Sequence, residues 1–160
     1  MEHIGERSRE VIDSISETIW AINPKNDSLQ DLLSYIRDHA MRHLSLKSIR
    51  CRSDIPETVP DVRNTAESRR AVFFVVKEAL HNIVKHSGAT EATAYFSAAP
   101  RVPEIRISDN GVGVDPEDFS RRGKGLSSVK KRLEDAGGTF GLTSRPGGGT
   151  EIRITVPSSG

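Results

Sequence analysis

The sequence predicts an α+β fold, a two-layer α/β sandwich in which helices cover one face of a mixed sheet, preceded by a helical segment. Segments with a hydrophobic period of two are separated by helices at some junctions and by hairpin turns at others. This mixture argues against a doubly wound parallel sheet. The length of 160 residues, 35% of them hydrophobic, suffices for one core and a short extension.

The first expected helix runs from Arg7 to Asn23. Its isoleucines recur at alternating spacings of three and four, which is typical of a helix that packs on another helix. Pro24 disfavours helix at the residue before it, and Ser28 with Asp31 three residues later is a typical helix start. The apolar stripes are Ile12, Ile15, Ile19 and Ile22 in the first helix and Leu29, Leu33, Ile36, Ala40 and Leu44 in the second.

Beyond the second helix the pattern changes from the helical period to the alternation of a strand, which is expected from Leu46 to Asp54. Asn64 with Glu67 three residues later is a capping pair, and it opens a long helix that continues to His86 and ends at a Ser-Gly pair. The remaining elements are expected as a helix at Leu126–Ala136 and strands at Thr93–Ser97, Glu104–Ser108, Thr139–Ser144 and Glu151–Val156.

Charge and composition exclude several classes of function. The 23 Lys and Arg against 22 Asp and Glu give a formal net charge of +1, with no basic patch that would suit nucleic acid. Cys51 is the sole cysteine, which excludes an internal disulfide and indicates a reducing compartment. No apolar run approaches the roughly 18 residues of a membrane helix. We therefore expect a cytoplasmic chain without nucleic-acid or membrane contact.

The most informative motif is Ser108-Asp109-Asn110-Gly111-Val112-Gly113, which directly follows an expected strand. An acid at a strand end, followed by two glycines, predicts a carboxylate at the bottom of a pocket and a backbone that a flat ring can approach. Such a carboxylate can accept a hydrogen bond from an exocyclic amine such as that of adenine. The same residues also suit an ordinary tight turn, so the rest of the chain decides between the two interpretations.

The long helix carries polar residues beside its apolar stripe. At about 100° per residue, Glu78, Asn82 and Lys85 fall on the flank of this stripe. A helix that lies on a sheet presents such a flank to the edge of a cleft. The alternative is a solvated face with an ordinary hydrogen bond between Glu78 and Asn82, which are four residues apart.

A second glycine cluster, Gly123-Lys124-Gly125-Leu126, stands at the start of an expected helix. Unpaired amides at a helix N-terminus form an anion site, and Lys124 adds a positive charge. The cluster is no Walker loop, because Lys124 is followed by Gly instead of Ser or Thr. The Gly111-x-Gly113 pair is no dinucleotide fingerprint, because it does not open a helix. A flexible loop before a helix is the alternative.

Four pieces follow one another along the chain. They are a helix with Glu and Asn four apart, Asp-Asn-Gly-x-Gly, Gly-x-Gly-Leu at a helix start, and Gly-Gly-Gly-Thr before the last strand. Their order and spacing resemble the ATP-binding domain of the GHKL superfamily, which contains histidine kinases, type II topoisomerases, heat-shock ninety chaperones and MutL. The resemblance covers Leu44 to Pro157, and it implies the Bergerat fold with ATP and Mg²⁺ as cofactors.

The resemblance implies a role for each candidate site residue. The stretch from Glu78 to His86 resembles the N box, in which Asn82 would coordinate the Mg²⁺ that bridges the ATP phosphates and Glu78 would activate the attacking group. Asp109 would accept the adenine amine. The other implied contacts are Lys85 and His86 near the phosphates, Gly111 and Gly113 beside the ring, Gly123, Lys124, Gly125 and Leu126 closing on the phosphates, and Thr150 in the adenine pocket, a contact that the family usually makes through water.

Within the superfamily the chain is most similar to sensor histidine kinases of the group that works with LuxR-type response regulators. The similarity is carried by Lys85-His86-Ser87-Gly88-Ala89, the cluster at residues 123–126 and Ala136-Gly137-Gly138. Residues Ser14 to Ser28 resemble the end of their dimerisation and phosphotransfer hairpin. The implied organisation is a remnant of the second hairpin helix with its linker at 1–27 and the catalytic domain at 28–160. The implied partners are the hairpin helices and a response regulator.

One departure from that group bears on activity. Its phosphorylated histidine is followed by an acid, whereas none of the five histidines here is. We therefore expect phosphoryl transfer from Mg-ATP to a histidine outside this chain, in the cytoplasm or in the cytoplasmic part of a membrane-bound sensor. Two alternatives stay open, a protein serine kinase of the anti-sigma-factor type and a non-catalytic ATP-sensing module.

Overall fold

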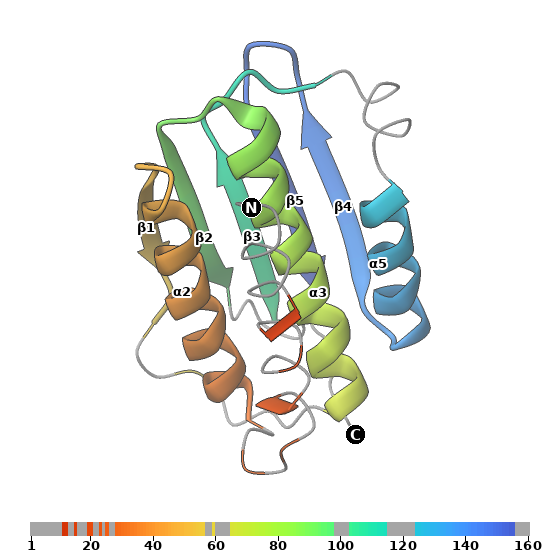
Figure 1. Ribbon diagram of the computed structural model, residues 1–160. Helices are drawn as coiled ribbons and strands as arrows, with labels where there is room; N and C mark the ends of the chain where they lie inside the picture. Colours follow the sequence, from red (N-terminus) through yellow and green to blue (C-terminus); the bar gives the residue numbers. More distant parts are fainter. Residues whose placement is uncertain are drawn as a thin grey trace.

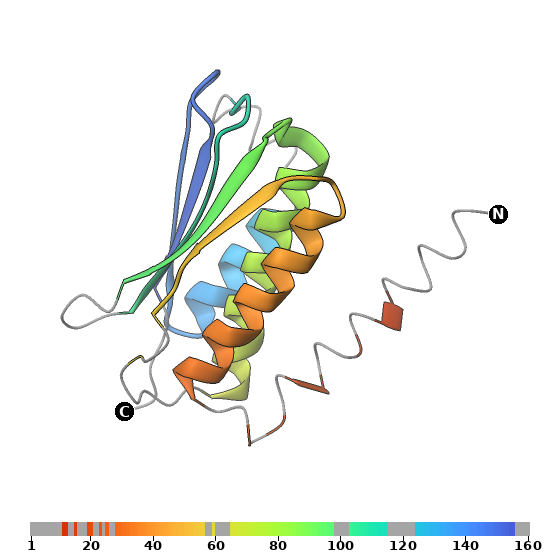
Figure 2. The same cartoon turned by 90° about the vertical axis from the view of Figure 1, so that its left-hand side faces the viewer.

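The computed structural model describes residues 28–56, 59, 65–97, 103–114 and 124–155, together with residues 11, 12, 15, 19, 20, 23 and 25. In this part of the chain, five strands form one sheet and three α-helices lie against a single face of it (Figures 1 and 2). The predicted two-layer α+β sandwich is therefore confirmed. The elements are α2 (Leu29–Ser45), β1 (Arg50–Asp54), α3 (Ala66–Asn82), the π-helical turn η2 (Ile83–Ser87), β2 (Glu91–Ser97), β3 (Glu104–Asp109), α5 (Lys124–Asp135), β4 (Thr139–Ser144) and β5 (Thr150–Thr155).

The strand order is β1-β2-β3-β5-β4. β1 and β2 are parallel, because α3 connects them as a crossover, and the other neighbours are antiparallel. The register places Asp109 at the end of β3 opposite Thr150 of β5, and Thr150 opposite Ser144 of β4. Asp109 is thus brought into one row with Ser144 and Thr150, which flank a much later turn, at the same end of the strands.

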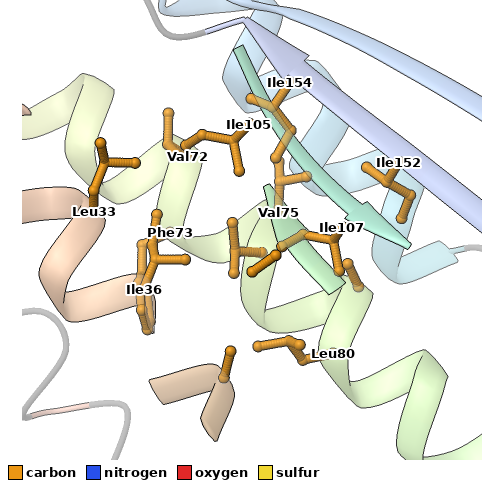
Figure 3. Close-up of a cluster of buried hydrophobic side chains, with 14 of the residues drawn as sticks. Leu33, Ile36, Val72, Phe73, Val75, Leu80, Ile105, Ile107, Ile152 and Ile154 are labelled. Atoms are coloured by element: carbon orange, nitrogen blue, oxygen red, sulfur yellow. The ribbon is translucent and has the colours of Figure 1, made fainter. Parts of the chain in front are cut away.

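The hydrophobic core lies between the sheet and the helices. Alternate residues of β3 and β5 point toward the helices, which is the period-two pattern of a strand with one covered face (Figure 3). Burying one such isoleucine or leucine stabilises the fold by about 1.5–3 kcal/mol. The residues that meet here include Leu33 and Ile36 of α2, Val72, Phe73, Val75 and Leu80 of α3, Ile105 and Ile107 of β3, and Ile152 and Ile154 of β5.

The other face of the sheet carries charged pairs. Arg153 Nε lies 2.8 Å from Glu151 Oε1, and Arg106 pairs with Glu104 in the same way on β3. Cys51 of β1 is half-buried, and burial raises the pKa of its thiol, so the thiol stays protonated at neutral pH. Within the described part of the chain, no helix is long and apolar enough to cross a membrane.

The strand predicted from Leu46 to Asp54 was placed too early. α2 continues to Ser45, and the strand begins only at Arg50. Between them the backbone N–H of Ile49 donates to the carbonyl oxygen of Leu44 at 3.1 Å, and Ser48 has a φ of 58°. This is a left-handed helix stop formed without glycine, so the sequence carries no glycine signal for it.

The predicted cap of the long helix was also misplaced. Thr65 is the N-cap, and its hydroxyl accepts a hydrogen bond from the backbone N–H of Ser68 at 3.0 Å. Asn64 lies outside the described residues. The cap predicted for the preceding helix is confirmed, because Ser28 Oγ accepts from the Asp31 N–H at 3.1 Å.

Other predicted boundaries agree to within two residues, except at the end of the long helix. There the α-helix stops at Asn82 and the chain continues as η2, which ends at Gly88 with a φ of 62°. The predicted strand Thr139–Ser144 matches β4. The shifted elements are β2, which begins at Glu91, β3, which extends to Asp109, β5, which spans Thr150–Thr155, and α5, which spans Lys124–Asp135.

The predicted N-terminal helix falls largely outside the described residues, as does Ile22. Of its described residues, Val11, Ile12, Ile15, Ile19 and Trp20 are helical and Asn23 is not, and the first four are exposed. Trp20 is half-buried, and its ring stacks on Tyr35 of α2 with 4.2 Å between the ring centroids. The segment therefore contacts the helical layer through this aromatic pair.

Candidate functional site

A cavity opens where the C-terminal part of α3 meets the ends of β3 and β5 and the start of α5. It is lined by residues of all these elements and of the loop after β3. Several predicted site residues lie together in it. The lining residues are Ala79, Asn82, Ile83, His86, Ser87, Ile107, Asp109, Gly113, Val114, Leu126, Thr150 and Ile152.

The walls of the cavity are mostly apolar. Ile107 and Ile152 are the last inward-facing residues before the cavity on β3 and β5, and Leu126 closes the side formed by α5. Leu126 was predicted as a site residue, whereas Ile107 and Ile152 were not, although their inward positions follow from the strand alternation. An apolar slot with one carboxylate at its end suits a flat heterocycle that carries an amine.

Asp109 is the acid of this cavity. Burial raises the pKa of the Asp109 carboxyl, and hydrogen bonds from the backbone N–H groups of Gly111 and Thr150 oppose that shift. The Gly111 N–H lies 2.8 Å from Asp109 Oδ1. A carboxylate has about four lone-pair sites, so capacity remains to accept a donor from a bound molecule.

The glycines of the motif have a steric role as well as the role predicted for them. A Cβ atom on Gly111 would lie 2.3 Å from the carbonyl oxygen of Ser87, and one on Gly113 would lie 1.9 Å from that of Arg145. The Cβ of a residue replacing Gly149 would lie 2.1 Å from the carbonyl oxygen of Asp109. Gly113 and Gly149 also have positive φ angles of 66° and 74°. These glycines therefore let three backbone segments pack directly on one another around the cavity.

Asn110 ties the motif to the turn before β2. Its side-chain Oδ1 accepts hydrogen bonds from the backbone N–H groups of Thr90 and Glu91, each at 3.0 Å. Its Nδ2 donates to the Thr90 hydroxyl at 2.9 Å. The sequence predicted no role for the Asn110 side chain. Its role in binding the turn before β2 is visible only in the tertiary contacts. These hydrogen bonds fix the position of Asn110, and therefore of the chain directly after Asp109.

Asn82 and Glu78 lie on α3 one turn apart, and both are half-buried. Asn82 lines the cavity, whereas Glu78 and the exposed Lys85 do not. The alternative of an ordinary hydrogen bond between Glu78 and Asn82 is wrong, because the described stretch of α3 contains no such bond. The Asn82 amide is therefore not held by its neighbour and faces a space where it can meet a ligand.

The second glycine cluster is described only in part. Gly123 lies outside the described residues, Lys124 and Gly125 are the first residues of α5, and Leu126 is buried against the cavity. Among the described residues, no group of three or more His, Cys, Asp or Glu could hold a metal ion. Mg²⁺ does not require such a group, since it is commonly bound by one or two protein oxygens, by waters and by substrate phosphates. The Asn82 amide fits that requirement.

A family model described as histidine kinase-, DNA gyrase B- and HSP90-like ATPase matches residues 67–160. The chain is 32% identical over 100 residues to the sensor histidine kinase LiaS of Bacillus subtilis, covering 61% of this chain and 28% of LiaS. It is 31% identical over 86 residues to the sensor protein VraS of Staphylococcus saprophyticus, covering 54% of this chain and 25% of VraS. The chain thus spans about a quarter of the length of these relatives.

Solved structures share the fold. The histidine kinase AdeS of Acinetobacter baumannii superposes with a TM-score of 0.66 at 16% identity, covering 96% of this chain and 82% of AdeS. Full-length ShkA in complex with AMPPNP superposes with a TM-score of 0.65 at 22% identity, covering 82% of this chain and 30% of ShkA.

Proposed function

The chain belongs to the histidine kinase-, DNA gyrase B- and HSP90-like ATPase family, and we propose that it is the ATP-binding catalytic part of a sensor histidine kinase. The observation that carries the proposal is the position of Asp109 in a largely apolar cavity, with its register partner Thr150 and the α3 residue Asn82 lining the same cavity. Sensor kinases among its relatives and an AMPPNP complex among its structural neighbours support this assignment.

The geometry suggests how ATP would bind. The adenine ring would lie between Ile107, Ile152 and Leu126, with its exocyclic amine donating to Asp109. The phosphates would extend toward α3 and toward the start of α5, whose first backbone amides have no partner within the helix. Mg²⁺, held by Asn82 and the phosphates, would neutralise the charge that develops on the transferred phosphoryl group.

Glu78 would act as the base that activates the attacking group, although Glu78 does not line the cavity. The proposed acceptor is a histidine on a dimerisation and phosphotransfer hairpin, of which residues 1–27 would be the end. Residues 28–160 would be the catalytic domain. A LuxR-type response regulator would then be the downstream partner, and the proposed location is the cytoplasm.

Calorimetric titration of ATP into this chain, with and without Mg²⁺, tests nucleotide binding. We expect binding that responds to Mg²⁺ in the wild type and is lost in Asp109→Asn. Asp54→Asn is the matched control, because Asp54 is an exposed strand-end aspartate on β1, at the opposite edge of the sheet from β4. An Asn82→Ala variant should bind ATP without a response to Mg²⁺. Equal binding by wild type and Asp109→Asn would refute the proposed site.

Phosphoryl transfer is tested by supplying a complete phosphotransfer hairpin in trans and following acid-labile phosphohistidine from labelled ATP. We expect Glu78→Gln to bind ATP normally and to transfer at a rate lower by about 10²-fold or more. Glu67→Gln is the matched control, because Glu67 is exposed in the first turn of the same helix. Phosphoserine on a partner would instead support the serine kinase alternative, and binding without any transfer would support the ATP-sensing module.

A further inference from the structure

A buried serine lies behind the end of the cavity that contains Asp109 and Thr150, where the adenine base would bind. Ser144 closes β4, is 9% exposed and does not itself line the cavity. Its hydroxyl lies 2.8 Å from the hydroxyl of Thr150, the next strand residue across the β4–β5 turn, and Thr150 does line the cavity. The backbone N–H of Val114 and the carbonyl oxygen of Gly149 complete its surroundings, at 2.9 and 3.3 Å from Ser144 Oγ.

Counting protons determines the direction of these hydrogen bonds. A serine hydroxyl has one proton to donate and two lone pairs that can accept. The Val114 N–H can only donate, so it occupies one lone pair of Ser144 Oγ. The Gly149 carbonyl can only accept, so it takes the serine proton. The second lone pair is then left for Thr150, and all three contacts are satisfied only if the Thr150 hydroxyl donates to Ser144.

This direction decides what Thr150 offers to a ligand. Its single hydroxyl proton is used on Ser144, so its oxygen can only accept on the cavity side. Asp109, the register partner of Thr150 on β3, is an acceptor as well when ionised. This end of the cavity therefore presents two hydrogen-bond acceptors, the Asp109 carboxylate and the Thr150 hydroxyl oxygen. They match the two N–H groups of one exocyclic amine.

We propose that Ser144 is a positioning residue that makes the site selective for the amino group of adenine by holding Thr150 as a hydrogen-bond acceptor. The proposal rests on the ATP-binding function proposed above. Without the Ser144 hydroxyl, the Thr150 hydroxyl is free to rotate and to turn its proton toward the cavity. The amine then loses a fixed acceptor, whereas the rest of the nucleotide keeps its contacts.

The test compares two nucleotides that differ only in that amine, ATP and purine riboside triphosphate. Their dissociation constants are measured by calorimetry for the wild type, Ser144→Ala, Ser144→Thr and Thr143→Ala. The ratio of the two constants isolates the contribution of the amine. It is also insensitive to partial unfolding of a variant, since both nucleotides meet the same folded fraction.

We expect Ser144→Ala to shrink this preference for ATP by about two- to tenfold, the value of one ordinary hydrogen bond. Ser144→Thr keeps the hydroxyl and should restore the preference. Thr143→Ala changes the exposed neighbour on the same strand and should leave it unchanged. If Ser144→Ala weakened the binding of both nucleotides equally, the ratio of their dissociation constants would be unchanged. That result would show a merely structural role and overturn the proposal. A wild type that binds neither nucleotide would overturn the ATP-binding function instead.

Discussion

The backbone N–H of Val112 donates a hydrogen bond of 2.8 Å to the carbonyl oxygen of Ser87. Ser87 ends the π-helical turn that follows Asn82, and Val112 lies within the glycine motif that follows Asp109. The bond therefore joins the two elements that carry the proposed magnesium ligand and the proposed adenine acceptor. A π-helical turn places more residues per turn than an α-helix, and such turns are frequent at functional sites.

A substitution at Gly111 tests whether the glycine motif must pack directly on the end of the π-helical turn. Changing Gly111 to Ala puts a Cβ atom 2.3 Å from the same Ser87 carbonyl oxygen and 2.8 Å from the Ser87 Cβ, so the motif must move away from the helix end. We expect a loss of about 1–3 kcal/mol in the free energy of unfolding, together with weaker nucleotide binding. Urea denaturation measures the first effect. Gly148→Ala is the matched control, because its nearest contact of 3.4 Å is tolerable, and a comparable loss there would contradict the steric explanation.

Asn110 should matter through its carbonyl oxygen more than through its amide nitrogen. Asn110→Ala removes the acceptor of two backbone N–H groups and one donor, and we expect it to destabilise the domain by about 1–2 kcal/mol. Asn110→Asp keeps the acceptor and loses only the bond to the Thr90 hydroxyl, so it should retain most of the stability. Thermal unfolding of the two variants side by side distinguishes them. Equal losses of stability in the two variants would mean that the bond from Asn110 Nδ2 to the Thr90 hydroxyl carries the effect, and would contradict this prediction.

Asp109 predicts a pH dependence of stability. Burial raises the pKa of its carboxyl in the folded state, so between the ordinary aspartate pKa and this raised value the folded protein holds a proton that the unfolded chain has lost. The contribution of Asp109 to stability is therefore largest below this window and declines as the pH rises through it. Asp109→Asn should remove that decline while it abolishes ATP binding. The measurement is the difference in unfolding free energy between the two proteins from about pH 4 to pH 7. An advantage of the wild type that grows with pH would contradict the direction of the shift.

Trp20 reports on the contact between the N-terminal segment and the helical layer. It is the only tryptophan of the chain, and it stacks on Tyr35 of α2, which in turn contacts Phe73 of α3. Tyr35→Ala should expose the indole ring and shift its fluorescence emission to longer wavelength. It should also lower the free energy of unfolding by about 0.5–1.5 kcal/mol more than the loss of buried apolar area alone would. Tyr95→Ala is the control, because Tyr95 lies on β2 beside Arg106, and an equal shift in both variants would refute the stacking as the cause.

Much of the fold could be predicted because its signals are local. The alternation in β3 and β5 identifies Ile105, Ile107, Ile152 and Ile154 as core residues within a few positions of sequence. The helix cap at Ser28 could be predicted for the same reason. The early start assigned to β1 was wrong because its signal is unusual, since a serine, Ser48, adopts the left-handed conformation there in place of glycine.

The candidate site could be predicted in part. The motifs pointed to Asn82, His86, Asp109, Gly113, Leu126 and Thr150, and the structure gathers them around one cavity. It shows Glu78 and Lys85 outside that cavity, although periodicity placed them on the same flank as Asn82. Periodicity gives the face of a helix, but which part of that face meets a cavity depends on the neighbouring elements.

The sequence by itself determined the layer architecture, the inward positions of the strands and the presence of an acid and glycines at a strand end, because each of these depends on residues close together in the chain. Only the tertiary structure decided that Ser144 stands behind Thr150, that Asn110 holds the turn before β2, and that Gly111 and Gly149 pack on distant carbonyl oxygens. These contacts depend on the order β3-β5-β4 and on the register between β3 and β5, whose paired residues lie 41 to 51 positions apart in sequence. That register is selected by packing of the whole sheet against the helices, and no local pattern encodes it.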